Sequence, residues 1–180
     1  MWLATLFLAL ACAAQTSTPS TNPAPAADMQ QVLAQQFGSD FTLDSSITPL
    51  MGDLDRDGQE DLVLVASSKD PTLGEADFHY QLVDPYDAYF GYGNPKMTLQ
   101  FTATNAGPAR FVLVVHGWRN PTPKAKFVII NLPFDQLSLS RMMIKKKATT
   151  VINSVETGGL AAAVFWDGKK YRWEPSYMGQ

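Results

Sequence analysis

The stretch MGDLDRDGQEDLVLVASS, residues 51–68, decides the fold of this chain. Its second half contains the apolar run LVLV at 62–65, which is typical of a buried strand because it is short, continuous and half β-branched. Its first half is rich in Asp and Gly, the residues that separate strands. The stretch therefore predicts an acidic loop that leads directly into a core strand.

The loop has the pattern D-x-D-x-D-G-x-x-D, from Asp53 to Asp61. The four aspartate carboxylates of this pattern lie within nine residues, so they repel one another unless a cation or nearby basic groups neutralise them. Alternate spacing lets the first three converge on one centre, and Gly58 permits the sharp turn that this requires. Ca²⁺ is the expected ion, because it accepts about six to eight hard oxygen ligands from a flexible loop. We expect its ligands to be the side chains of Asp53, Asp55, Asp57 and Asp61, the backbone carbonyl of Gln59, and water.

The loop differs from an EF-hand, which has a bidentate Glu at its twelfth position and flanking helices. Counting from Asp53, that position is Leu64, which lies in the predicted strand. From Gly52 to Leu62 the chain instead resembles the FG-GAP and VCBS-type calcium loops of integrin-like propeller blades and secreted bacterial proteins. The resemblance implies that the calcium-coordinating positions are Asp53, Asp55, Asp57, Gln59 and Asp61. A propeller needs several blades, and one such motif excludes it.

A second interpretation of the loop needs no metal ion. Asp53 and Asp57 could cap backbone amides of an ordinary surface turn, with Arg56 or the basic C-terminal half supplying positive charge. Residues 1–115 carry 4 basic and 13 acidic side chains, whereas residues 116–180 carry 10 and 4. This asymmetry supports pairing between the two halves, so both interpretations stay open.

Further strands are predicted on the C-terminal side of the loop, where short apolar runs alternate with Gly, Pro, Asn and Asp. An Asp167-Gly168 two-residue turn predicts a C-terminal β-hairpin. The spacing of apolar residues from Asp135 to Ser154 fits neither the helical nor the strand period cleanly. It favours extended structure that includes at most one helical turn. The other strands are expected at Phe78 to Val83, Met97 to Thr104, Phe111 to Val115, Phe127 to Ile130, Ala162 to Trp166 and Tyr171 to Trp173.

One helix is predicted on the N-terminal side of the loop. Apolar residues from Met29 to Phe37 recur at helical spacing, Asp28 can cap the start, and Gly38 can end the helix. The expected fold class is therefore α+β: a strand-rich single domain over 28–180 with a short N-terminal helix and a C-terminal β-hairpin. Residues 15–27 are rich in Pro, Ser and Thr and predict a disordered linker.

Residues 1–14 predict a signal peptide. The apolar run that begins at Trp2 is shorter than a membrane span and is followed by small residues in the A-x-A relation. We therefore expect a secreted or periplasmic protein without a membrane span. Cys12 follows a sequence that loosely resembles a bacterial lipobox, so a lipid anchor at Cys12 is the alternative to simple cleavage.

The composition narrows the class of protein further. The 180 residues contain 14 basic and 17 acidic side chains, which does not suggest a nucleic-acid-binding protein. A single Cys excludes an intrachain disulfide framework. We expect an exported, non-enzymatic domain with one structural calcium site, which could serve as an envelope or extracellular interaction module with a protein or glycan ligand. The alternative is a small periplasmic enzyme near His79, Asp87 or His116, or a carbohydrate- or peptide-binding module that uses the Tyr/Gly-rich loop 84–93.

Overall fold

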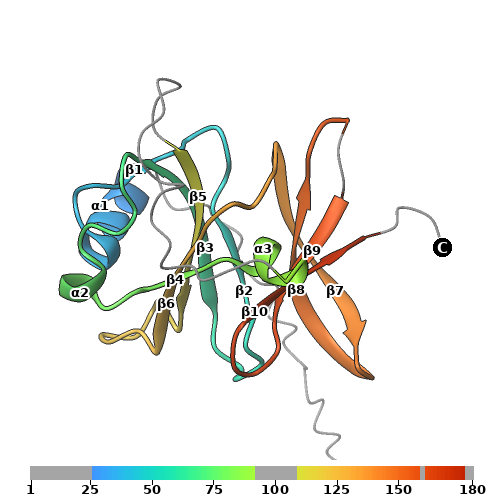
Figure 1. Ribbon diagram of the computed structural model, residues 1–180. Helices are drawn as coiled ribbons and strands as arrows, with labels where there is room; N and C mark the ends of the chain where they lie inside the picture. Colours follow the sequence, from blue (N-terminus) through green and yellow to red (C-terminus); the bar gives the residue numbers. More distant parts are fainter. Residues whose placement is uncertain (1–25, 92–108, 159–160, 177–180) are drawn as a thin grey trace, which may run out of the picture.

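The computed structural model describes residues 26–91, 109–158 and 161–176 as a single α+β domain. The expected signal peptide, almost all of the linker and the predicted strand at 97–104 lie outside these residues. Figure 1 shows three layers: helix α1 (Ala26–Phe37) covers one face of a six-stranded sheet, and a four-stranded sheet lies on the other face. The strand-rich fold expected from the sequence is confirmed.

The six-stranded sheet is centred on β3 (Asp61–Ser68), which follows the acidic loop directly. Its neighbours are β5 (Ala109–His116) on one side and both β1 (Thr42–Leu43) and β2 (Leu50–Gly52) on the other, all antiparallel. The sheet continues through β6 (Ala125–Ile129) to β4 (Gln81–Val83), which pairs with β6 in parallel. The acidic loop therefore connects two paired strands, β2 and β3, at one end of this sheet.

The four-stranded sheet is an antiparallel meander that contains the C-terminal hairpin. Its strands are β7 (Gln136–Ile144), β8 (Lys147–Val155), β9 (Ala161–Trp166) and β10 (Tyr171–Pro175). The predicted helical turn within 135–154 is wrong, since β7 and β8 form a hairpin through Lys145 and Lys146. Both lysines have positive φ, 47° and 66°, as a tight two-residue turn requires.

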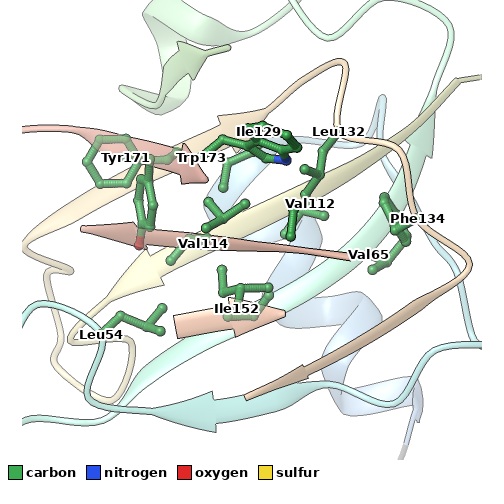
Figure 2. Packing of buried hydrophobic residues seen from close by; sticks show 14 residues of the cluster. Leu54, Val65, Val112, Val114, Ile129, Leu132, Phe134, Ile152, Tyr171 and Trp173 are labelled. Atoms are coloured by element: carbon green, nitrogen blue, oxygen red, sulfur yellow. The ribbon is translucent and has the colours of Figure 1, made fainter. Parts of the chain in front are cut away.

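The central strand is continuously apolar because it is buried on both faces. Leu62 and Leu64 pack toward α1 in one hydrophobic cluster, whereas Val63 and Val65 pack toward the four-stranded sheet in another. Figure 2 shows this second cluster, in which Val65 lies among residues of several strands, such as Ile152 and Trp173. Alternation along β3 thus joins all three layers.

Three local predictions are corrected by the structure. Helix α1 begins at Ala26, so Asp28 lies within its first turn and is not its cap. Ala is the strongest helix former, which explains the earlier start. Of the strand predicted at 78–83 only 81–83 is extended, because Phe78 ends the short helix α2 (Glu75–Phe78) and its ring packs beside Gly38.

The third correction concerns the C-terminal hairpin, whose turn is longer than two residues. Trp166 pairs with Tyr171, so residues 167–170 all belong to the turn. The carboxylate of Asp167 accepts hydrogen bonds from the amides of Lys169 and Lys170, at 2.9 and 3.0 Å. A side-chain acceptor at the first turn position stabilises this longer loop.

Helices in the described part of the chain are short. None of them is long and apolar enough to cross a membrane.

Candidate metal centre

The acidic loop bends back on itself between β2 and β3. Gly58 has φ 84° and Arg56 has φ 64°, so two loop residues adopt the left-handed conformation. A Cβ at Gly58 would meet no atom within 4 Å, so the backbone conformation and not space favours glycine there. These two turns bring the first and last aspartates of the loop toward each other.

Asp61 anchors the loop from inside the protein. Its side chain is fully buried, and its Oδ2 accepts hydrogen bonds from the amides of Leu54 (2.7 Å) and Asp55 (3.3 Å). Its Oδ1 accepts from the amide of Gly117, at 2.8 Å. Burial raises the pKa of Asp61 above its usual 3.8, and the amides of Gly117 and Leu54 oppose that rise. The carboxylate thus ties the loop to the end of β5.

Asp53, Asp55 and Asp57 accept hydrogen bonds from amides within the loop. Asp53 accepts from Asp57 and Gly58, both at 3.1 Å, and Asp55 accepts from Asp57 at 3.2 Å. Asp57 accepts from the amide of Gln59 at 2.8 Å, which is the main reason why its pKa is lowered. The capping roles predicted for Asp53 and Asp57 are therefore present in the folded loop.

Three of the five predicted ligand residues come together as a possible metal site. Asp53, Asp55 and Asp61 each offer one carboxylate oxygen, and these oxygens lie within 4.8 Å of one another. Asp57 is not part of this group. The side-chain oxygen of Gln59 accepts a hydrogen bond from the side-chain Nδ2 of Asn120, at 2.5 Å. The structure therefore places an acidic group at the loop that could hold a metal ion.

Lys124, at the end of the β5–β6 connection, supplies positive charge to the loop. Its Nζ lies 2.6 Å from Oδ2 of Asp55 and 3.2 Å from Oδ2 of Asp57. The hydrogen bond to Asp55 is the main reason why the pKa of Lys124 is raised. The carboxylate of Asp55 is almost fully buried, whereas Lys124 is half exposed. The ammonium group can therefore move into solvent if another cation replaces it.

His116, the last residue of β5, lies behind the loop and is 1% exposed. Its Nε2 is 2.7 Å from the hydroxyl of Tyr171, and its Nδ1 is 3.6 Å from Oδ2 of Asp55. Burial lowers the pKa of His116, and the nearby carboxylates of Asp61 and Asp55 oppose this. Burial likewise raises the pKa of Tyr171. This chain of polar contacts connects the acidic loop to β10.

The residues that complete the site come from distant parts of the chain. Lys124, His116 and Gly117 all follow or end β5, far from the acidic motif in sequence. Gly117 has φ 62°, and a Cβ there would lie 2.7 Å from Nδ2 of Asn120. The sequence signal for this group was the predicted strand from Phe111 to Val115, which ends just before His116 and Gly117 but gives no sign of their contact with the loop.

Comparison with protein-family models, with curated proteins and with solved structures found no match for this chain.

Proposed function

We propose that this protein is an exported, non-enzymatic domain with one structural calcium site in the loop from Asp53 to Asp61. The observation that carries the proposal is the convergence of carboxylate oxygens from Asp53, Asp55 and Asp61 within 4.8 Å. Hard anionic oxygens on a curled loop are the donors that Ca²⁺ prefers. The likeness of residues 52–62 to FG-GAP and VCBS-type loops supports the same ion.

The donor set suits calcium better than magnesium. Mg²⁺ requires a small octahedral site and keeps several waters, whereas Ca²⁺ accepts many protein oxygens in irregular geometry. In our proposal Asp53, Asp55 and Asp61 hold the ion, and Asp57 and the Gln59 carbonyl join them as the resemblance implies. Lys124 then leaves Asp55, since its ammonium and the ion would compete for the same carboxylate.

A structural role follows from the position of the loop. One end continues from β2, the other is the first residue of β3, and Asp61 also holds Gly117 after β5. An ion bound there would link the loop to the central sheet by replacing repulsion among carboxylates with attraction to one centre. A ligand that binds only the folded state raises stability by mass action.

Thermal unfolding of the purified domain in millimolar CaCl₂ and in EDTA tests the proposal. We expect a higher midpoint with calcium, by several degrees for a site filled well above its Kd. Asp53→Ala should abolish this difference. Asp70→Ala is the matched control, because Asp70 also accepts hydrogen bonds in a turn, from the amide and hydroxyl of Thr72, but lies outside the acidic group.

The outcomes separate the two interpretations of the loop. A calcium-dependent midpoint in the parent and in Asp70→Ala, but not in Asp53→Ala, supports the proposal. Equal midpoints with calcium and with EDTA in all three proteins would overturn it, and would favour a turn neutralised by Lys124 and Arg119. Replacing CaCl₂ with MgCl₂ tests the choice of ion, since magnesium should give a clearly smaller rise.

A further inference from the structure

A second candidate site lies beside the C-terminal hairpin, and Arg56 of the acidic loop is one of its lining residues. A cavity of about 300 Å³ is bounded by α3 (Pro85–Tyr89), the β7–β8 turn and the β9–β10 hairpin. Its described lining includes none of His79, Asp87 and His116, the residues considered for an enzyme. We infer that this cavity binds an anionic saccharide, in which one sugar ring stacks on aromatic side chains and its acidic groups contact lysines.

The charge of the cavity wall favours an anion. Five basic side chains line it, from Arg56, Lys145, Lys147, Lys170 and Arg172, against two acidic ones, Asp167 and Glu174. Arg172 is paired with Asp167, with 2.6 Å between Nε and Oδ2. Within the described ranges, the other four basic side chains have no ion pair. They come from three separate turns and are exposed, so they present positive charge around one opening.

Aromatic side chains form the apolar part of the wall. Tyr89 is 50% exposed, and its ring lies 4.9 Å from that of Trp173, centroid to centroid. Trp166 is half-buried and packs against Tyr171, with centroids 5.3 Å apart. These partners fix the rings in place. A rigid aromatic face with an exposed surface suits the C–H face of a sugar ring.

The combination of rings and cations favours an acidic saccharide over a small inorganic anion or a neutral sugar. A bare phosphate or sulfate ion would gain no stacking on Tyr89, and a neutral sugar would gain hydrogen bonds but no charge attraction from the lysines. The cavity is at the small end of ligand-binding pockets, which suits a ring-sized unit of a chain that extends into solvent. A uronate- or sulfate-bearing sugar satisfies both the apolar and the cationic walls.

Isothermal titration calorimetry on the full domain, in calcium-containing buffer, tests the inference. The probes are a tetragalacturonate, a heparin-derived tetrasaccharide, neutral maltotetraose and a hexaglutamate peptide. We expect one of the two acidic saccharides to bind, and the neutral saccharide to bind at least tenfold more weakly. The inference would be overturned if hexaglutamate bound as tightly as the better of the two acidic saccharides. It would also be overturned if neither acidic saccharide bound.

Neighbouring lysines provide a matched test of where the saccharide binds. Lys147 and Lys170 line the cavity, whereas Lys146 and Lys169 in the same turns do not. The double variant Lys147→Gln/Lys170→Gln should weaken binding about tenfold, and Lys146→Gln/Lys169→Gln, with the same change in net charge, less than twofold. Equal weakening by both pairs would mean diffuse attraction to a basic surface and would contradict a site in the cavity.

Tyr89 tests the aromatic wall separately from the charge. Tyr89→Ala should weaken binding of the acidic saccharide at least fivefold, whereas Tyr89→Phe, which retains the ring, should preserve most of it. The thermal unfolding midpoint of each variant checks that the domain is still folded. Unchanged affinity in a folded Tyr89→Ala variant would refute the stacking role.

Discussion

Two turns in this domain use aspartate carboxylates to accept hydrogen bonds from backbone amides, but the two turns carry different amounts of negative charge. The turn at 167–170 has a single carboxylate, Asp167, which accepts two backbone amides and pairs with Arg172. The loop at 53–61 has five carboxylates, of which Asp55 and Asp57 contact Lys124 and Glu60 pairs with Arg119. Both turns contain a glycine with positive φ, Gly168 and Gly58. They differ in how completely their own chain neutralises them.

The comparison shows which carboxylates of an acidic turn are neutralised by the protein's own side chains. The carboxylate of Asp167 accepts two amides and pairs with one guanidinium, so its charge is neutralised and it needs no external ligand. In the acidic loop Asp53 and Asp61 have amide donors but no ion-pair partner among the described residues. A metal ion would bind to these two carboxylates, because their negative charge has no ion-pair partner among the described residues.

The largest effect should come from Asp61, where the acidic loop is most unlike the simple turn. Asp61→Ala leaves the buried amides of Leu54 and Gly117 without their acceptor, and each lost partner costs about 1–2 kcal/mol. We expect the free energy of unfolding to fall by about 3 kcal/mol in EDTA, where no metal contributes. Urea denaturation at equilibrium measures this change.

Asp61→Asn keeps one acceptor oxygen and should cost clearly less than Asp61→Ala. Asp40→Ala, at an exposed carboxylate, serves as the control and should change stability by no more than about 0.5 kcal/mol. A loss for Asp61→Ala as small as that for Asp40→Ala would show that the buried carboxylate does not anchor the loop.

An intermediate effect is expected at Asp167, and it should depend on pH. Partial burial acts to raise the pKa of Asp167, but Arg172 and the amides of Lys170 and Lys169 outweigh it and lower the pKa to about 2. The unfolded carboxyl titrates near 3.8, so the stabilisation is complete above pH 4 and is lost as the pH falls through 2. Asp167→Asn should therefore cost about 1 kcal/mol at pH 7.

Chemical denaturation of parent and Asp167→Asn at pH 7, 4 and 2.5 follows this loss. The difference in unfolding free energy should shrink steadily below pH 4, because protonation removes the charge that pairs with Arg172. A difference that stays constant at all three values would mean that the charge of Asp167 does not contribute to stability.

The smallest effect should follow removal of the ammonium group from the acidic loop. Lys124→Gln removes the cation that contacts Asp55 and Asp57, so in EDTA the domain should unfold at a slightly lower urea concentration, since solvent screens a pair with an exposed ammonium group. Calcium should then bind about threefold more tightly, since it no longer displaces a positive charge. Calorimetric titration with CaCl₂ measures the affinity, and Lys169→Gln is the charge-matched control. Unchanged affinity would show that Lys124 and the ion do not compete.

Most of the fold could be predicted because the core strands are marked by local sequence. The runs at 62–65 and 111–115 are continuously apolar since both faces are covered, and no tertiary information is needed to recognise them. The β7–β8 hairpin was harder to predict. Its strand β7 is largely exposed, and its turn uses Lys145 and Lys146 at positive φ, where Gly, Asn or Asp would have been a signal.

Only the residues of the candidate metal site that lie in one loop could be predicted from the sequence. The spacing of Asp53, Asp55 and Asp61 is contained in nine residues, so their convergence follows from one loop. Their partners Lys124 and His116 approach because β5 pairs with β3, and that long-range register leaves no pattern near either residue. Sequence could therefore suggest the ligands but not the cation that competes for them.

Arg56 has a consequence for how the two sites would act together. It lies between Asp55 and Asp57 in the acidic loop, yet its side chain lines the cavity beside the C-terminal hairpin. An ion that fixes the loop would also fix where this guanidinium sits, and so would alter the affinity of the cavity for an anion. Reciprocity then requires the anion to change the affinity for the ion by the same factor. A single arginine would thus couple occupancy of the cation site to occupancy of the anion site.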